Sequence, residues 1–249
     1  MKNNFIKSIK SSKSSSSRLK FLMVASYPES IIGFRGALIE SIQSLGIQVH
    51  ILFPNSKNEE TCCKLAKMGV KVHDYKINRK GTSIIIELWT IFSLYTKIIN
   101  IRPDILFSYT IKPVIYSGLL SFFYPVSRSF ALITGLGYAF QHQKNRRNLA
   151  QFIAQILYRF SLKKVTKVFF QNPDDEQLFR ERRLLKKQKP SVVVNGSGVD
   201  IEAFNPCDLP PNFSFLLIAR LIKAKGIFEF LEAAKSISQK YKNVSFKLV

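Results

Sequence analysis

The chain has 249 residues, 46% of them hydrophobic, so it can bury a core and is neither a disordered tail nor a small disulfide-stapled scaffold. Its 38 Lys and Arg against 16 Asp and Glu give a net charge of +22. Such a surface attracts nucleic acids, anionic lipids or phosphorylated small molecules, and charge alone does not choose between them. Three cysteines and three histidines without paired ligand spacing exclude a disulfide framework and a helical His-Glu-x-x-His metal site, and favour a reducing compartment.

The first residues differ in composition from the rest of the chain. Residues 1–18 are rich in Lys and Ser, contain no acidic residue and lack an apolar segment of signal-peptide length. We interpret them as a flexible basic leader, with a transit peptide as the alternative. The longest apolar stretches, Val114–Val126 and the region of Trp89, are shorter than the roughly 20 residues that cross a bilayer, so we expect no membrane span.

From Leu19 onward, short apolar runs alternate with segments of helical period, which is the pattern of β-α-β units. The expected strands begin at Lys20, Gln48, Val70, Asp104, Phe130, Lys167 and Ser191. The expected helices include Gly33–Leu45, with its apolar stripe at Phe34, Ala37, Leu38 and Ile42, then Glu59–Lys67 and Ser83–Asn100. Six or seven such strands predict an α/β fold with one Rossmann-like, doubly wound parallel sheet.

Residues 195–213 are dense in Pro and Gly and are typical of a linker between domains. After them, Ser214–Ala219 is expected to be a buried strand, Ile227–Tyr241 an amphipathic helix and Val244–Val249 a second strand. These 36 residues are fewer than the usual domain minimum of about 50, so we expect an incomplete second Rossmann-like unit. The predicted organisation is a leader at 1–18, a domain at 19–194, a linker at 195–213 and a truncated domain at 214–249, whose last strand is weakly ordered or associates.

The turn after the expected strand 214–219 is a candidate anion site. Arg220 and Lys225 bring two cations to the carboxyl end of a parallel strand, and Gly226 permits close approach of the backbone. Arginine can hold a phosphate through two parallel hydrogen bonds, and lysine adds a point charge. The alternative is a pair of solvated surface cations at the start of a helix.

Turns of the larger domain supply further candidates. Gly33 and Gly36 follow the first strand, either as ligand contacts or as packing residues. No turn carries the three-glycine dinucleotide fingerprint or a Walker loop, so the sequence supports no nicotinamide or flavin site, and a P-loop NTPase fails its most specific test. Later strands are followed by polar side chains expected on the ligand-binding edge of the sheet, or else in ordinary strand-to-helix turns: Tyr109, Thr110, Lys112 and Thr134.

The segment Lys144–Lys164 is amphipathic and basic. Its apolar face is formed by Leu149, Phe152, Ile153, Ile156, Leu157 and Phe160, and its cations lie near both ends. The face can pack on the sheet, or it can lie on an anionic bilayer, where each basic residue contributes about 1 kcal/mol. Nucleic acid would also suit the charge, but no RNA-binding or zinc-finger signature accompanies it.

Four segments together resemble a known family: Tyr109-TIKP, Thr134-GLGYAF, Asn195-GSGVDIEAF and Ala219-RLIKAKGIFEFLEAA. They are similar to GT-B glycosyltransferases of family 4, which are retaining enzymes, and to bacterial members that extend a sugar on undecaprenyl diphosphate. The resemblance runs from about Leu19 to the last residue. It implies that Gly33, Arg220 and Lys225 bind the diphosphate of a nucleotide sugar, without a metal or a further cofactor. It also implies an acceptor side formed by Tyr109, Thr110, Lys112, Thr134, Gly135 and Gly137.

The chain departs from the family pattern in two places. Ser108, Tyr109 and Thr110 stand where many members have a histidine, so no catalytic base is assigned. The paired glutamates that hold the donor in the family belong to a region beyond Val249. We therefore expect the isolated chain to be inactive or to need a second chain that completes the C-terminal domain.

The expected function is transfer of a hexosyl or N-acetylhexosaminyl group from a nucleotide sugar, UDP-linked, to a lipid-linked or polysaccharide acceptor. The expected partners are the nucleotide sugar, a lipid-linked glycan and an anionic membrane, and the expected location is the cytoplasm, peripheral at the inner face of the cytoplasmic membrane. The alternative is a non-catalytic basic module that binds a membrane or a partner protein. Nucleic acid is not an expected partner.

Overall fold

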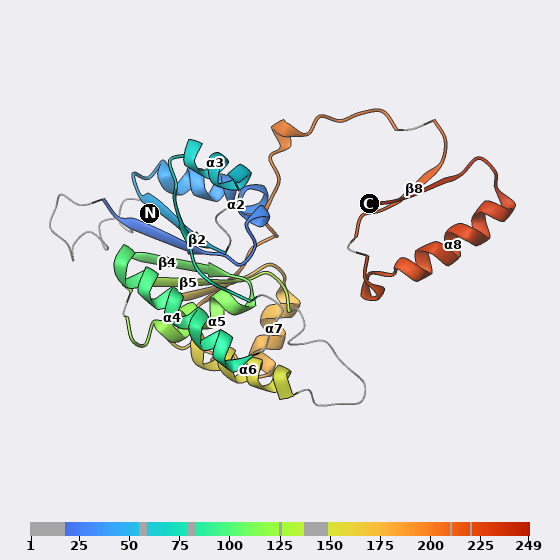
Figure 1. Ribbon diagram of the computed structural model, residues 1–249. Coiled ribbons are helices and arrows are strands. Elements are labelled where there is room, and N and C mark those ends of the chain that lie inside the picture. The colour runs from blue at the N-terminus through green and yellow to red at the C-terminus, as the bar shows by residue number, and fades with distance from the viewer. Residues whose placement is uncertain are drawn as a thin grey trace. The chain divides into compact units, whose positions relative to one another are not determined.

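The computed structural model describes residues 18–54, 59–78, 83–124, 126–136, 149–209, 211–219 and 221–249. The chain divides into two compact units, Met1–Val199 and Asp200–Val249 (Figure 1). The division falls within residues 195–213, the stretch expected to be a linker. The two units are described separately below.

Unit 1 is built around a seven-stranded sheet in which every neighbouring pair is parallel, in the order β3-β2-β1-β4-β5-β6-β7. Its strands are β1 (Lys20–Val24), β2 (Gln48–Phe53), β3 (Lys71–Asp74), β4 (Ile105–Tyr109), β5 (Arg128–Ile133), β6 (Lys167–Phe170) and β7 (Ser191–Val193). The predicted Rossmann-like sheet is confirmed. Because the chain runs outward from β1 to β3 and then returns to the other side of β1 as β4, the strand order reverses between β1 and β4. Ligands of such sheets bind at this switch point, beyond the carboxyl ends of the strands.

Helices cover both faces of the sheet (Figure 1). On one face lie α2 (Glu29–Gln43) and α3 (Glu59–Lys67), and on the other lie α4 (Ile84–Ile101), α5 (Ile111–Leu120), α6 (Leu149–Ser161) and α7 (Pro173–Glu181). Each face has its own core. Ile31 and Leu65 pack into the first, and Leu94 and Phe179 pack into the second.

Helix α2 begins four residues before the predicted start, and its buried face differs from the predicted stripe. The buried side chains are Ile31, Arg35 and Ile39, whereas Phe34 is 59% exposed. The predicted stripe is therefore wrong. Gly33 lies inside the helix on its exposed side rather than in a turn before it, and a Cβ built at Gly33 would meet no atom within 4 Å.

In the described part of the segment Lys144–Lys164, the predicted apolar face is mostly exposed, and of its six side chains only Leu157 packs against the core. Helix α6 packs through Tyr158 and Leu162, while Phe152 and Phe160 are 62% and 46% exposed. The helix approaches α5 closely at Gly118, where an added Cβ would lie 2.5 Å from the carbonyl oxygen of Ser161. Packing on that small contact leaves the wide apolar face of α6 in solvent.

Helix α4 is the one helix among the described residues that is long and apolar enough to cross a membrane, with a mean hydropathy of 1.5 over 18 residues. Only 22% of it is buried. Length and composition alone are weak evidence for a membrane span, since core helices of soluble proteins can be equally long and apolar. The absence of a membrane span stays a prediction.

Unit 2 contains a β-α-β arrangement. Strand β8 (Ser214–Leu217) pairs in parallel with β9 (Ser245–Leu248), and α8 (Ile227–Lys240) connects them, with short 3-10 turns at η2 (Ile201–Ala203) and η3 (Lys223–Lys225). The expected elements are present. Strand β8 is exposed at its first three residues, so the expectation of a buried strand is wrong.

Two histidines that the sequence leaves 23 residues apart stack on neighbouring strands of unit 1. The ring planes of His50 and His73 are inclined by 2° with centroids 5.1 Å apart, and Nδ1 of His50 lies 2.9 Å from Nε2 of His73. Burial, together with the charges of His73, Lys71 and Lys20, lowers the pKa of His50 to about 4. Burial also lowers the pKa of His73, so both rings are neutral near pH 7.

This pair makes stability depend on pH. In the unfolded chain His50 is protonated near its ordinary pKa of about 6.5, whereas in the folded chain it is protonated only near pH 4. The free energy of unfolding therefore decreases as the pH falls through the window from about 6.5 to about 4. We expect a loss on the order of 3 kcal/mol from His50 across the window. Urea unfolding near pH 7 and near pH 4 measures it. A His50→Gln variant should lose less over the same window, and an equal loss would assign the pH dependence elsewhere.

Candidate functional site

Polar side chains meet where β1 and β4 end, at the switch point. The hydroxyl of Ser26, just beyond β1, lies 2.8 Å from the hydroxyl of Thr110, just beyond β4. Thr110 has φ of 69°, a backbone conformation that is rare outside glycine and that is concentrated at functional sites. It precedes α5 without capping it by its side chain, and an uncapped helix N-terminus at this edge favours an anionic ligand.

Tyr109 lies beneath this edge rather than on it. The ring is 2% exposed, and the phenol oxygen lies 2.9 Å from the hydroxyl of Ser30 on α2. Burial raises the pKa of Tyr109 even though Ser30 and Arg35 act in the opposite direction. The phenol is therefore neutral and serves as a hydrogen-bonding and packing group, not as a base.

Arg35 is the charged residue of this cluster that the sequence did not single out. Its side chain is 6% exposed, and its guanidinium carbon lies 5.0 Å from the centroid of the Tyr109 ring. Nη1 donates to the carbonyl of Phe34 and to the hydroxyl of Ser197, and Nε has no hydrogen-bond partner in the described part of the chain. Burial lowers the pKa of Arg35, with Tyr109 opposing.

Among the described residues, no ion pair gives Arg35 a carboxylate partner. A buried guanidinium without a counter-ion is unfavourable in the free protein and favours an incoming anion, which it can hold in a bidentate manner. The signal in the sequence is its position, since Arg35 interrupts the i, i+4, i+8 stripe of Ile31 and Ile39.

Lys112, predicted on the acceptor side, is engaged within the protein. Its Nζ donates to the carbonyl of Asn78 and to a carboxylate oxygen of Glu87, and the Tyr116 hydroxyl donates to the other oxygen of that carboxylate. Burial and the bond to Glu87 raise the pKa of Tyr116. This network ties α5 to α4 and to the segment after β3, and Glu87 balances the charge of Lys112.

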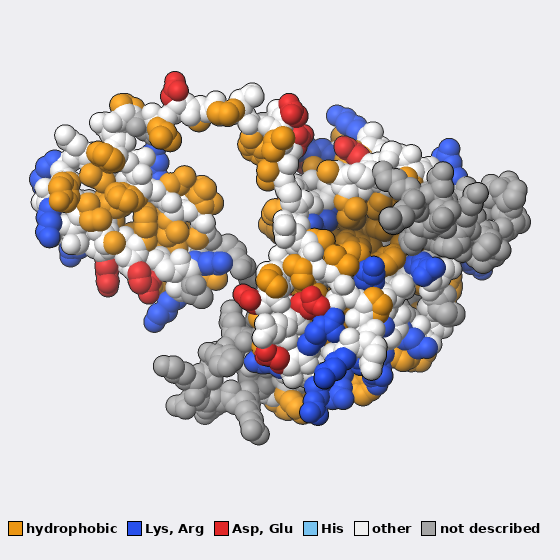
Figure 2. All heavy atoms as spheres, turned by 180° about the vertical axis from the view of Figure 1, so that it is seen from behind, with side chains coloured by type: hydrophobic (Ala, Val, Ile, Leu, Met, Phe, Trp, Pro, Cys, Tyr) orange, Lys and Arg blue, Asp and Glu red, His pale blue; other side chains and the backbone are white. Residues whose placement is uncertain are grey.

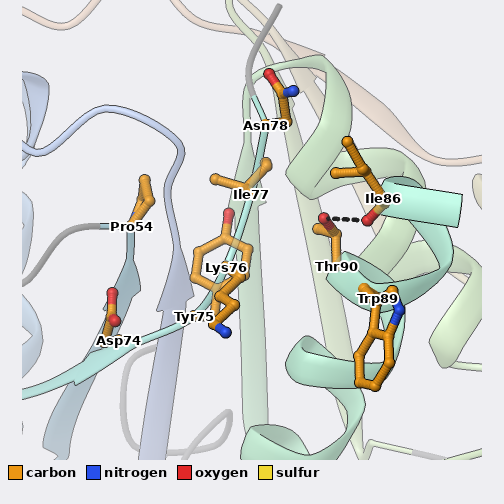
Figure 3. Close-up of a pocket in the computed structure, with 9 residues that line it drawn as sticks. All are labelled: Pro54, Asp74, Tyr75, Lys76, Ile77, Asn78, Ile86, Trp89 and Thr90. Carbon is orange, nitrogen blue, oxygen red and sulfur yellow. Dashed lines mark hydrogen bonds between the residues drawn. The ribbon is translucent and has the colours of Figure 1, made fainter. Parts of the chain in front are cut away.

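A hollow of about 420 Å³ opens beside that network (Figure 3). The segment that follows β3 forms one wall, and the first turns of α4 form the other. Its lining consists of Pro54, Asp74, Tyr75, Lys76, Ile77, Asn78, Ile86, Trp89 and Thr90. The Tyr75 hydroxyl donates to the carbonyl of Ala25 at 2.8 Å, so the inner wall of the hollow adjoins the end of β1 at the switch point.

The remaining predicted residues have separate positions. Thr134 is exposed after β5, and Gly135 has φ of 133°, which favours glycine. Lys225 is exposed in η3 of unit 2. It directly precedes Gly226, which has φ of 75° and is the N-cap residue of α8. Gly137 and Arg220 lie outside the described residues.

Tyr109 and Thr110 are thus brought together with Ser26, Ser30 and Arg35, whereas Lys112 belongs to the adjacent network. Over the described ranges, no group of three or more His, Cys, Asp or Glu side chains could hold a metal ion.

The Rossmann-like sheet of unit 1 has the fold of the N-terminal part of a GT-B protein. Residues 30–172, more than half of the chain, match the model of the family described as glycosyl transferase 4-like. The chain therefore belongs to the glycosyl transferase 4-like family.

One relative is the N,N'-diacetylbacillosaminyl-diphospho-undecaprenol alpha-1,3-N-acetylgalactosaminyltransferase of Campylobacter jejuni subsp. jejuni serotype O:2. It is 26% identical over 225 residues, which cover 85% of this chain and 58% of the relative. Solved structures agree in fold. A sucrose-phosphate synthase from Thermosynechococcus elongatus matches with a TM-score of 0.67 at 12% identity, over 93% of this chain and 62% of that one.

The UDP-GlcNAc 2-epimerase from Neisseria meningitidis matches with a TM-score of 0.59 at 16% identity, over 92% of this chain and 65% of that one. The chain thus spans about three fifths of the length of these similar proteins. At such identities the structural matches establish the fold alone.

Proposed function

We propose that the protein takes part in the transfer of a hexosyl or N-acetylhexosaminyl group from a nucleotide sugar to a lipid-linked acceptor. The observation that carries this proposal is the switch-point cluster, in which the strained Thr110 lies within hydrogen-bond distance of Ser26 at the ligand-binding edge of the sheet, and the buried Arg35, which has no carboxylate partner among the described residues, packs over the neighbouring Tyr109. The family membership supports glycosyl transfer, and the Campylobacter relative, whose name specifies a diphospho-undecaprenol acceptor, supports the acceptor class.

The two units divide the substrates in this proposal. Unit 1 supplies the acceptor side, where Arg35 and the N-terminus of α5 offer positive charge to a phosphate of the substrate. Unit 2 supplies cations for the donor diphosphate, namely Arg220 and Lys225, which precede α8 in the sequence. In this proposal they stabilise charge on the leaving nucleoside diphosphate, expected to be UDP. Gly33 and the acceptor role of Thr134, Gly135 and Gly137 stay predictions from the resemblance.

A peripheral position on an anionic membrane belongs to the same proposal. Five large apolar side chains of α6 are between 38% and 70% exposed: Leu149, Phe152, Ile153, Ile156 and Phe160. Lys163 Nζ lies 4.2 Å from the centroid of the Phe160 ring, and Lys164 Nζ lies 5.5 Å from that of Phe122. Figure 2 shows Lys and Arg side chains beside hydrophobic ones along the lower part of unit 1.

A basic hollow of about 650 Å³ adjoins the end of α6. It is lined by Arg159, Lys163, Arg180, Glu181, Arg183, Leu184, Leu185, Lys186 and Lys187. Arg180 donates to Glu176 and to the carbonyls of Lys186 and Lys187, which fixes the loop that carries these cations. Cations and apolar side chains next to one another are the composition of a surface that binds anionic lipid.

Transfer of a labelled sugar tests the proposal. Membranes of cells with the gene and of cells without it are supplied with a prenyl-diphosphate saccharide and with labelled UDP-sugars, GDP-sugars or dTDP-sugars in turn. We expect a labelled, lipid-extractable product that depends on the gene and on one donor. The same products in both membranes, with every donor, would contradict it.

A further inference from the structure

Helix α4 presents an apolar face that neither core uses. Ile85, Leu88, Trp89 and Phe92 follow the spacing i, i+3, i+4, i+7 and so share one side of the helix, and each is more than half exposed. The four side chains line a shallow hollow of about 330 Å³. The buried side of the same helix is formed by Thr90, Leu94 and Ile98. Contiguous exposed apolar surface of this kind marks a site of interaction.

Trp89 belongs to two hollows at once. Its indole lines the apolar hollow of α4, and it also lines the larger hollow shown in Figure 3, at the carboxyl edge of the sheet. The larger hollow is partly polar, because Asp74, Lys76 and Asn78 line it together with the main chain that follows β3. The apolar face and the polar edge of the sheet are therefore continuous through one aromatic side chain.

We propose that this pair of hollows is the acceptor subsite, with the sugar-bearing head in the polar hollow and the apolar lipid chain along the exposed face of α4. The inference rests on the proposed function and assigns it a place. An amphiphile fits this surface, because the hollow at the edge of the sheet is partly polar and the adjoining face of α4 is apolar. The indole of Trp89 at the junction offers its ring to a sugar and its apolar edge to the chain.

The position relative to the switch point supports this occupant. Tyr75 forms the inner wall of the polar hollow, and its hydroxyl bonds to Ala25, the residue before Ser26. The wall of the hollow therefore reaches the strand end that carries Ser26, the partner of Thr110. The network of Glu87, Lys112 and Asn78 holds the two walls together and keeps the hollow open beside the N-terminus of α5.

The chain offers a direct reporter, because Trp89 is its single tryptophan. We would titrate the full chain, in buffer free of vesicles and detergent, with geranyl diphosphate that carries one N-acetylhexosamine. A second titration would use the same sugar diphosphate without the prenyl group. The prenyl-bearing probe should shift the emission of Trp89 to the blue in a saturable manner, and the prenyl-free probe should give a much smaller shift.

Two variants localise the effect. Leu88→Ser removes one apolar side chain of the α4 face and should weaken the apparent affinity for the prenyl-bearing probe about tenfold. Phe123→Ser is the matched control, since Phe123 is 76% exposed and lines neither hollow, and it should leave the affinity unchanged. Equal losses in both variants would overturn the inference, as would equal shifts with both probes.

Other occupants of the α4 face give different results. A blue shift with neutral vesicles alone, and none with the soluble prenyl probe, would assign the face to the bilayer. A shift that grows with protein concentration in the absence of any probe would assign it to a second copy of the chain. Either result overturns the subsite. The titration measures binding, whereas the assay with labelled sugars measures transfer. If no transfer depends on the gene, the proposed function is refuted, and the titration still tests the binding site by itself.

Discussion

Replacing Arg35 by methionine is expected to stabilise unit 1 and, at the same time, to slow glycosyl transfer by roughly 100-fold or more. The stability gain, about 1 to 2 kcal/mol, follows because a buried guanidinium that has no carboxylate partner among the described residues is replaced by an apolar chain of similar length. The expected loss of rate follows because the buried cation that packs over Tyr109, the neighbour of the strained Thr110, is no longer available to a phosphate of the substrate. Urea unfolding and the gene-dependent transfer assay measure the two effects.

Arg35→Lys is the matched control for this prediction. Lysine keeps the charge but lacks the planar fork that bonds Ser197 and packs over Tyr109, so we expect part of the activity to survive without the gain in stability. If Arg35→Met raises the free energy of unfolding while it lowers the rate of transfer, Arg35 is a ligand-binding residue and not a structural one. If Arg35→Met instead unfolds more easily and loses activity only in proportion to the folded fraction, Arg35 holds the linker residue Ser197 and does not act on substrate.

The sheet of unit 1 could be predicted because most of its strands are apolar runs bounded by Gly, Pro or a helical segment, whereas the edge strand β3 has a single apolar residue, Val72. All five residues of β4 are buried, as is typical of a central strand in a parallel sheet. Its nearly continuous apolar sequence therefore predicts both the strand and its burial. The helices were harder. In α2 and α6 more apolar residues are present than the core uses, so the sequence shows an amphipathic helix without showing which stripe is buried.

The site was predictable in position but not in its residues. The carboxyl ends of β4 and β5 follow from the strand order, which places Thr110 and Thr134 on the correct edge. Whether a side chain at this edge faces solvent or packs beneath it depends on the helices that cover the sheet. Tyr109 therefore turned out buried, and Lys112 turned out to be paired with Glu87 from a helix 25 residues away in sequence.

The affinity of the chain for anionic membranes should depend on a small number of its cations and not on its net charge. Lys163 and Lys164 follow α6, and Lys186 and Lys187 line the basic hollow beside it, all four exposed. With about 1 kcal/mol from each basic residue near an anionic bilayer, changing these four lysines to glutamine should weaken binding by roughly 1,000-fold. Sedimentation with vesicles that contain phosphatidylserine measures the change, and added salt should weaken the wild-type binding in the same direction.

Unit 2 provides a control with the same change in charge. Lys235, Lys240, Lys242 and Lys247 are exposed there, and their replacement by glutamine lowers the net charge by the same amount. The predicted result is near wild-type binding for this variant, because binding at the surface of α6 needs apolar side chains and cations side by side. An equal loss of membrane affinity in both variants would show that the interaction depends on net charge alone. Replacing Phe152 and Ile156 by serine completes the test, since binding by charge alone would survive that change.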